Sequence, residues 1–144
     1  MNGLRHLLRK GLCLALLLPA LSHADMVAIV AAHSEAATLS RREVINIFMG
    51  RYRFLPSGHA IKPYDLPAGD PRKASFYLAL TGRDLVDIDT YWARLVLTGA
   101  ASPPDETPSQ ELMLERVARN PWAIGYVERS QADKRVRVIF EPER

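Results

Sequence analysis

The 144-residue sequence predicts an α/β domain in which about four helices flank a small mixed β-sheet. Short apolar runs of strand length lie at residues 26–32, 122–127 and 135–140, and a weaker strand is predicted at 60–66. Four segments between these runs begin at a capping residue and carry apolar side chains at helical spacing. The order strand, helix, strand, three helices and two strands indicates a mixed sheet with helices on its faces.

The first 24 residues have the composition of a cleaved secretory signal peptide. Arg5, Arg9 and Lys10 precede an apolar run that is too short to span a bilayer, and Ala24 ends a small-residue cleavage site. We expect cleavage after Ala24, which leaves residues 25–144 as one periplasmic domain. A retained membrane anchor is the alternative.

Charge and cysteine content exclude several classes of function. The chain has 19 Lys and Arg against 16 Asp and Glu, and the first 24 residues hold three of the bases and no acid. Residues 25–144 therefore carry 16 charges of each sign, which gives no basic field for nucleic-acid binding. Cys13, the one cysteine, lies in the signal segment, so no disulfide or thiol chemistry is expected.

The first two helices have clear start and stop signals. Ser40 and Glu43 form a predicted capping box, and Gly50 follows the apolar face of the first helix as its expected stop. A loop over residues 51–59 and the strand at 60–66 come next. Asp70 is the expected N-cap of the second helix, with Pro71 at its first position, and Gly82 ends it.

The third helix has the strongest periodicity in the chain. Apolar residues 88, 91, 92, 95 and 96 form one stripe, Asp84 or Asp87 can cap the helix, and Gly99 ends it. A proline-rich exposed loop is expected at 101–108, followed by a helix from Ser109 through residue 119. The two closing strands follow, and their spacing predicts that Trp92 and Trp122 belong to the core.

Two stretches carry a resemblance to a known family. IFMGR at 47–51 and NPWAIGYV at 120–127, with Phe76 and the Tyr91-Trp92 pair between them, resemble the phosphate-type periplasmic solute-binding proteins and, more narrowly, short single-lobe relatives of them. The resemblance covers roughly residues 26–140. It implies one lobe of the type II periplasmic-binding-protein fold and a solute-binding role for an ABC transporter or a sensor.

Residues 63–76 match the turn in which the family holds its anion at the start of a helix. The detail differs, because Asp70, Pro71 and Arg72 stand where the family has serine, glycine and threonine. Proline has no amide hydrogen, and a carboxylate at Asp70 repels phosphate. Two functions therefore remain open: a binder of a small anion such as phosphate, and a ligand-free interaction module of an envelope or signalling complex. A possible homodimer could supply the missing wall of the cleft.

Candidate ligand contacts have structural alternatives. Asp70 is an expected helix cap, Gly125 can allow close backbone approach, and Tyr126 can belong to the core. No enzyme, cofactor or metal site is predicted: His33, Ser34 and Asp65 lack a nucleophile-elbow motif, and the two histidines after residue 25 are far apart. The candidate ligand-binding residues are Ser34, Arg51, Asp70, Arg72, Lys73, Ser75, Gly125 and Tyr126.

Overall fold

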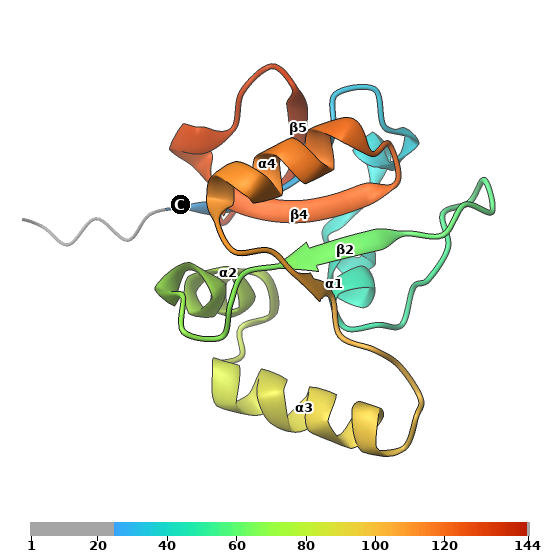
Figure 1. The fold of residues 1–144 in the computed structure, drawn as a ribbon, viewed down its shortest axis with the longest axis vertical. Coiled ribbons are helices and arrows are strands. Elements are labelled where there is room, and N and C mark those ends of the chain that lie inside the picture. Colours follow the sequence, from blue (N-terminus) through green and yellow to red (C-terminus); the bar gives the residue numbers. More distant parts are fainter. Residues whose placement is uncertain (1–24, 144) are drawn as a thin grey trace, which may run out of the picture.

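The computed structural model describes residues 25–143 and contains a five-stranded mixed sheet with the order β3-β2-β4-β1-β5 (Figure 1). Strand β1 is antiparallel to both β4 and β5, whereas β2 is parallel to β3 and β4. The predicted α/β class with a mixed sheet is confirmed. The strands are β1 (Met26–Ala31), β2 (Lys62–Asp65), β3 (Asp105–Glu106), β4 (Ala123–Glu128) and β5 (Val136–Phe140).

All four predicted helices form, and each begins after a side chain that caps its first turn. Ser40, Asp70, Asp84 and Ser109 each accept a hydrogen bond from a backbone N–H of the helix that follows. The capping box between Ser40 and Glu43 is present. The helices are α1 (Arg41–Phe48), α2 (Pro71–Thr81), α3 (Leu85–Leu97) and α4 (Gln110–Arg119), with short 3-10 turns at Glu35–Thr38 and Arg129–Gln131.

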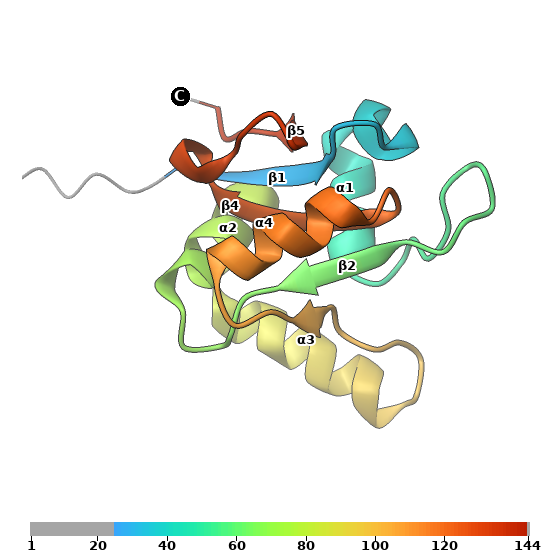
Figure 2. The same ribbon diagram turned by 45° about the horizontal axis from the view of Figure 1, so that its top comes forward.

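The helices form layers on both faces of the sheet. Helix α4 covers one face of β4 and β1, and α1 and α2 pack on the other (Figure 2). Helix α3 packs chiefly against α2 and lies at the margin of the molecule. None of the helices in the described residues combines the length and hydropathy that a membrane span needs.

An aromatic cluster fills the layer between the sheet and helices α1 and α2. The rings of Phe76 and Tyr126 stack with centroids 3.9 Å apart, and Phe48 meets Phe76 edge to face at 4.9 Å. All three side chains are fully buried, as is Tyr77 beside them. Tyr126 is therefore a core residue, which was one of its two predicted roles.

Three details differ from the sequence prediction. Strand β3 lies inside the predicted proline-rich loop, because its two-residue parallel pairing with β2 is too short to leave a periodic pattern. The core assignment of Trp122 is wrong: 39% of the residue is exposed, and its ring stacks on His59 with centroids 4.5 Å apart. Val96, predicted on the inward stripe of α3, is exposed. The predicted signal segment lies outside the described residues.

Gly125 lets α4 approach β4, as the sequence suggested. A Cβ atom at this position would lie 2.5 Å from the Met113 sulfur and 2.9 Å from Cγ2 of Val117. Gly125→Ala should therefore lower the free energy of unfolding by about 1–3 kcal/mol, the usual cost of overpacking. Chemical denaturation of residues 25–144 measures this change.

Gly69→Ala is the matched control, because nothing lies within 4 Å of a Cβ atom added there. That variant should stay within about 0.5 kcal/mol of the unmodified protein. Equal stability of the two variants would show that α4 does not need the missing side chain at Gly125.

Candidate functional site

The buried carboxylate of Asp65 lies at the end of β2 and is the centre of the candidate site. Its Oδ1 accepts hydrogen bonds from the Leu66 amide at 2.9 Å and from the Tyr126 hydroxyl, while Oδ2 accepts one from the Tyr77 hydroxyl at 2.9 Å. The ammonium of Lys73 lies 3.4 Å from Oδ2. Two tyrosines, one amide and one cation thus surround a single carboxylate.

The two tyrosines are locked in their neutral, hydrogen-donating form. Burial is the main reason that the pKa values of Tyr77 and Tyr126 are raised well above the ordinary value, and the adjacent Asp65 carboxylate raises them further. Each hydroxyl therefore keeps its proton at pH values at which a free tyrosine begins to ionise, and it continues to donate to Asp65 there.

The first amides of helix α2 are already hydrogen-bonded within the chain. Asp70 accepts a hydrogen bond from the Arg72 amide on its side-chain oxygen, at 3.0 Å, and from the Lys73 amide on its carbonyl oxygen, also at 3.0 Å. Pro71 occupies the first helical position and has no N–H. The predicted capping role of Asp70 is confirmed, and its carboxylate takes the place at the helix start where an anion would bind.

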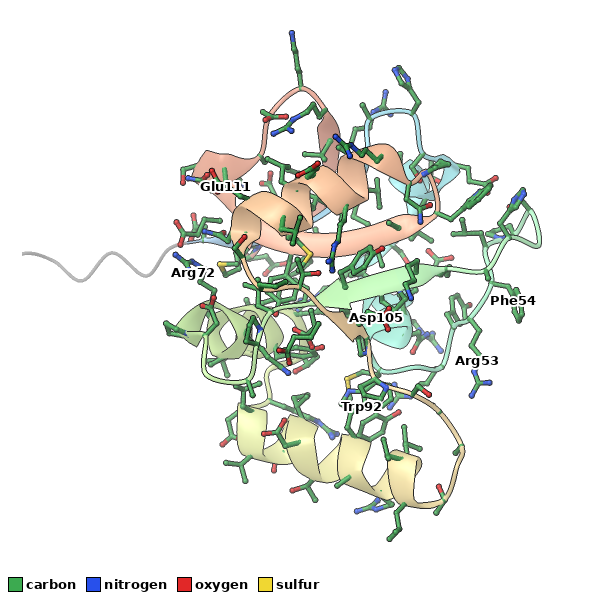
Figure 3. The ribbon with its side chains drawn as sticks, viewed as in Figure 1. Arg53, Phe54, Arg72, Trp92, Asp105 and Glu111 are labelled. Atoms are coloured by element: carbon green, nitrogen blue, oxygen red, sulfur yellow. The ribbon has the colours of Figure 1, made fainter. Side chains whose placement is uncertain are left out.

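The guanidinium of Arg72 is held by two carboxylates. Its Nε lies 2.6 Å from Glu128 Oε1, and its Nη1 lies 3.1 Å from Asp70 Oδ2. The hydrogen bond to Glu128 is the largest reason that the pKa of Arg72 is raised. Figure 3 shows Arg72 beside the start of α2, on the side of the molecule where β4 ends. The side chain is 40% exposed, so the ion pairs lie at the surface.

The charges at the site sum to −1. Asp65, Asp70 and Glu128 contribute three negative charges, and Arg72 and Lys73 contribute two positive ones. Each cation is within 4 Å of a carboxylate of the same chain. An arriving anion would therefore meet a net negative field rather than a positive one.

The structure brings together only part of the predicted ligand set. Asp70, Arg72 and Lys73 lie together at the start of α2. Tyr126 is linked to Lys73 indirectly, because both contact the carboxylate of Asp65. Ser75 is one helical turn further on, where its hydroxyl donates to the Pro71 carbonyl at 3.2 Å. Sequence reasoning did not include Asp65 or Glu128 in this set.

The other three predicted residues have local roles elsewhere. Ser34 caps the first 3-10 turn and donates to the Pro121 carbonyl at 2.5 Å, beside the start of β4 and thus at the opposite end of that strand from Glu128. Arg51 lies over the Tyr91 ring, 5.8 Å from its centroid. Gly125 packs against α4.

A cavity of about 490 Å³ adjoins Asp65 and Lys73 and runs between α3 and the β3 edge of the sheet. Its walls are largely apolar, with Trp92 between α3 and the sheet (Figure 3), and Asp89 and Glu106 add two further carboxylates. The indole Nε1 of Trp92 is buried and has no hydrogen-bond partner within residues 25–143. No cluster of three or more potential metal ligands occurs in these residues.

Comparisons with known proteins identify the fold. No protein-family model matches the sequence, and the search of curated proteins finds no match. An ABC-type phosphate transport receptor from Vibrio cholerae matches with a TM-score of 0.61 and 17% identity over 80% of this chain. A Clostridium perfringens protein solved with bound phosphate, and provisionally assigned as a phosphate ABC transporter substrate-binding protein, matches with a TM-score of 0.62 and 14% identity over 80% of this chain.

A possible phosphate-binding protein from Planctomyces limnophilus also matches, with a TM-score of 0.58 and 9% identity. The chain spans 45%, 44% and 40% of these three proteins, respectively. At these identities the likeness establishes the fold alone. The chain thus has the fold of part of a phosphate-type periplasmic binding protein, as its sequence motifs predicted. The names of the first two neighbours refer to phosphate ABC transport.

The buried tyrosines predict an alkaline loss of stability. Their pKa values in the folded protein lie above the unfolded value near 10, so above about pH 10 the unfolded chain releases protons that the folded chain keeps. The contribution of the two tyrosines to the free energy of unfolding is therefore fully present below about pH 10. It falls as the pH rises further, with a slope of about 2.7 kcal/mol per pH unit for two tyrosines.

Tyr126→Phe should halve this slope, whatever its effect on stability at pH 7. Urea denaturation at a series of pH values measures it, with Tyr52→Phe as a control because Tyr52 is exposed. An unchanged slope in the Tyr126 variant would contradict the assignment of Tyr126 as a neutral donor.

Proposed function

We propose that this chain is a periplasmic domain of the solute-binding fold that serves an ABC transporter or a membrane sensor as an interaction module, without a high-affinity anion of its own. One observation carries the proposal: the cations and the helix start that could hold an anion are already bound by the chain's own carboxylates. Asp70, Glu128 and Asp65 pair with Arg72 and Lys73, and Asp70 also caps the helix. The domain acts by binding a partner, not by catalysis.

Electrostatics supports this reading. Phosphate would have to displace Glu128 from Arg72 and Asp65 from Lys73, and it would still face Asp70. Two like unit charges 4 Å apart repel by about 4 kcal/mol at an effective dielectric constant of 20. The chain also spans less than half of the proteins it matches. The Arg72 side chain is 40% exposed, so polar contacts that an anion made to it would stay hydrated and weak.

Weak binding of a small anion, phosphate or a related one, is the second candidate. It is favoured by the fold shared with proteins whose names refer to phosphate, and by the surface position of Arg72 beside the start of α2. In that case the chain would deliver or report the anion to a transporter or sensor. Either role requires export, which we attribute to a signal peptide cleaved after Ala24.

Thermal denaturation of residues 25–144 with millimolar phosphate, sulfate or acetate separates the two candidates. We expect no stabilisation by any of them. An anion present at 100 times its dissociation constant would add about 2.7 kcal/mol, which is readily detected as a higher melting temperature. Stabilisation by phosphate alone would overturn the ligand-free proposal and establish the second candidate.

Glu128→Gln tests the electrostatic argument directly. The change removes the carboxylate that holds Arg72 Nε and brings the charge of the site from −1 to zero. Phosphate affinity, measured by calorimetry, should rise by about tenfold or more, because the lost repulsion is worth at least about 1.4 kcal/mol.

Glu115→Gln is the matched control, since Glu115 pairs with Arg119 on α4 at the surface and changes the net charge equally. It should leave phosphate affinity unchanged. Equal affinity in both variants would show that Glu128 does not keep anions out, and the proposal would lose its main support.

A further inference from the structure

Helix α3 has an apolar stripe that the described part of the chain leaves uncovered. Val86 is 73% exposed and Leu97 is 88% exposed, and Ala93 between them is exposed as well. Their spacing of i, i+7 and i+11 places them along one line of the helix, opposite the buried Ile88 and Trp92. Figures 1 and 2 both show α3 at the margin of the molecule, so a partner can reach this helix.

Two unpaired charges flank the same stripe. Asp87 and Arg94 are exposed, and neither forms an ion pair within residues 25–143. They are seven residues apart, which is about 10 Å along a helix, too far for the two side chains of one copy to pair directly. They lie on the same flank of the helix, because seven residues make almost two full turns.

We propose that α3 pairs with α3 of a second copy, antiparallel and about a twofold axis, so that the protein forms a homodimer. Reversing the helix places Val86 opposite the partner's Leu97 and Thr90 opposite the partner's Ala93. Because a twofold axis between antiparallel helices brings like flanks together, Asp87 lies near the partner's Arg94, and the reciprocal pair forms on the other half. The small side chains at the centre allow the two helices to approach closely.

The charge pattern selects a second copy over an unrelated occupant. Acidic residues are concentrated in the first half of α3 and Arg94 in the second half, so the stripe is complementary to itself only when reversed. Antiparallel pairing also opposes the two helix dipoles. Residues 25–144 carry no net charge, so the approach of two copies meets no overall repulsion. This inference goes beyond the proposed function and requires no ligand.

Sedimentation equilibrium of residues 25–144, from micromolar to millimolar protein, tests the proposal. We expect a reversible monomer–dimer equilibrium, since one helix pair makes a small interface of the weak, transient class. Leu97→Asp should weaken dimerisation by at least about tenfold, and its side chain is so exposed that the fold should survive, as circular dichroism can check. A monomer at every concentration would overturn the proposal.

Charge reversal tests the antiparallel register. Arg94→Glu should weaken dimerisation by about tenfold, because it turns two attractive contacts per dimer into repulsive ones, and adding Asp87→Arg to the same chain should restore it. Arg137→Glu makes the same change of net charge on β5, where Arg137 is exposed. It should have no effect, because β5 and α3 lie at opposite ends of the molecule in Figure 1.

A dimer that persists in Leu97→Asp, or that Arg94→Glu weakens no more than Arg137→Glu, would overturn the proposed interface. Failure of the second substitution to restore the Arg94→Glu variant would overturn the antiparallel pairing. Binding of phosphate is measured separately, so neither result depends on the outcome of the anion experiments.

Discussion

The buried carboxylate of Asp65 joins three parts of the fold. It lies at the end of β2 and accepts hydrogen bonds from Tyr126 on β4 and Tyr77 on α2, while Lys73 on α2 supplies the compensating charge. A charge inside a protein is tolerated only where paired and hydrogen-bonded groups replace its water. The register of β2 against β4 and the position of α2 are therefore linked, because moving any of these elements would leave a buried charge or hydroxyl without a partner.

The same constraint determines what the site can do. A helix start beside a strand end is a general anion-binding arrangement, since free amides and the helix dipole favour negative charge there. In this chain the protein itself supplies the negative charge. Asp65 pairs with Lys73, Asp70 caps the helix, and Glu128 pairs with Arg72. The geometry of an anion site remains, but its donors stabilise the fold and are not available to a solute without exchange of partners.

The sequence contained most of the fold because most of the fold is set by local signals. Helix caps such as Ser40 and Asp70, and the glycine stop at Gly50, act within a few residues, so each could be predicted from its neighbours. The Asp65 network could not, because Tyr126 is 61 residues away and no period links the two. Glu128 was missed for the same reason: its partner Arg72 lies on a different element 56 positions earlier, and no sequence period links the two.

The small size of the domain bears on the exposed stripe of α3 as well as on the site at the start of α2. A domain of about 120 residues buries roughly two-thirds of its unfolded surface, so some apolar side chains remain outside. Phe54 and Leu78 are exposed elsewhere, but Val86, Val96 and Leu97 all fall on one helix, which packs mainly on α2 rather than on the sheet. An exposed apolar stripe rimmed by charges is typical of a binding surface. With the donors at α2 already satisfied by internal carboxylates, the exposed stripe of α3 is the surface through which we propose that this lobe associates.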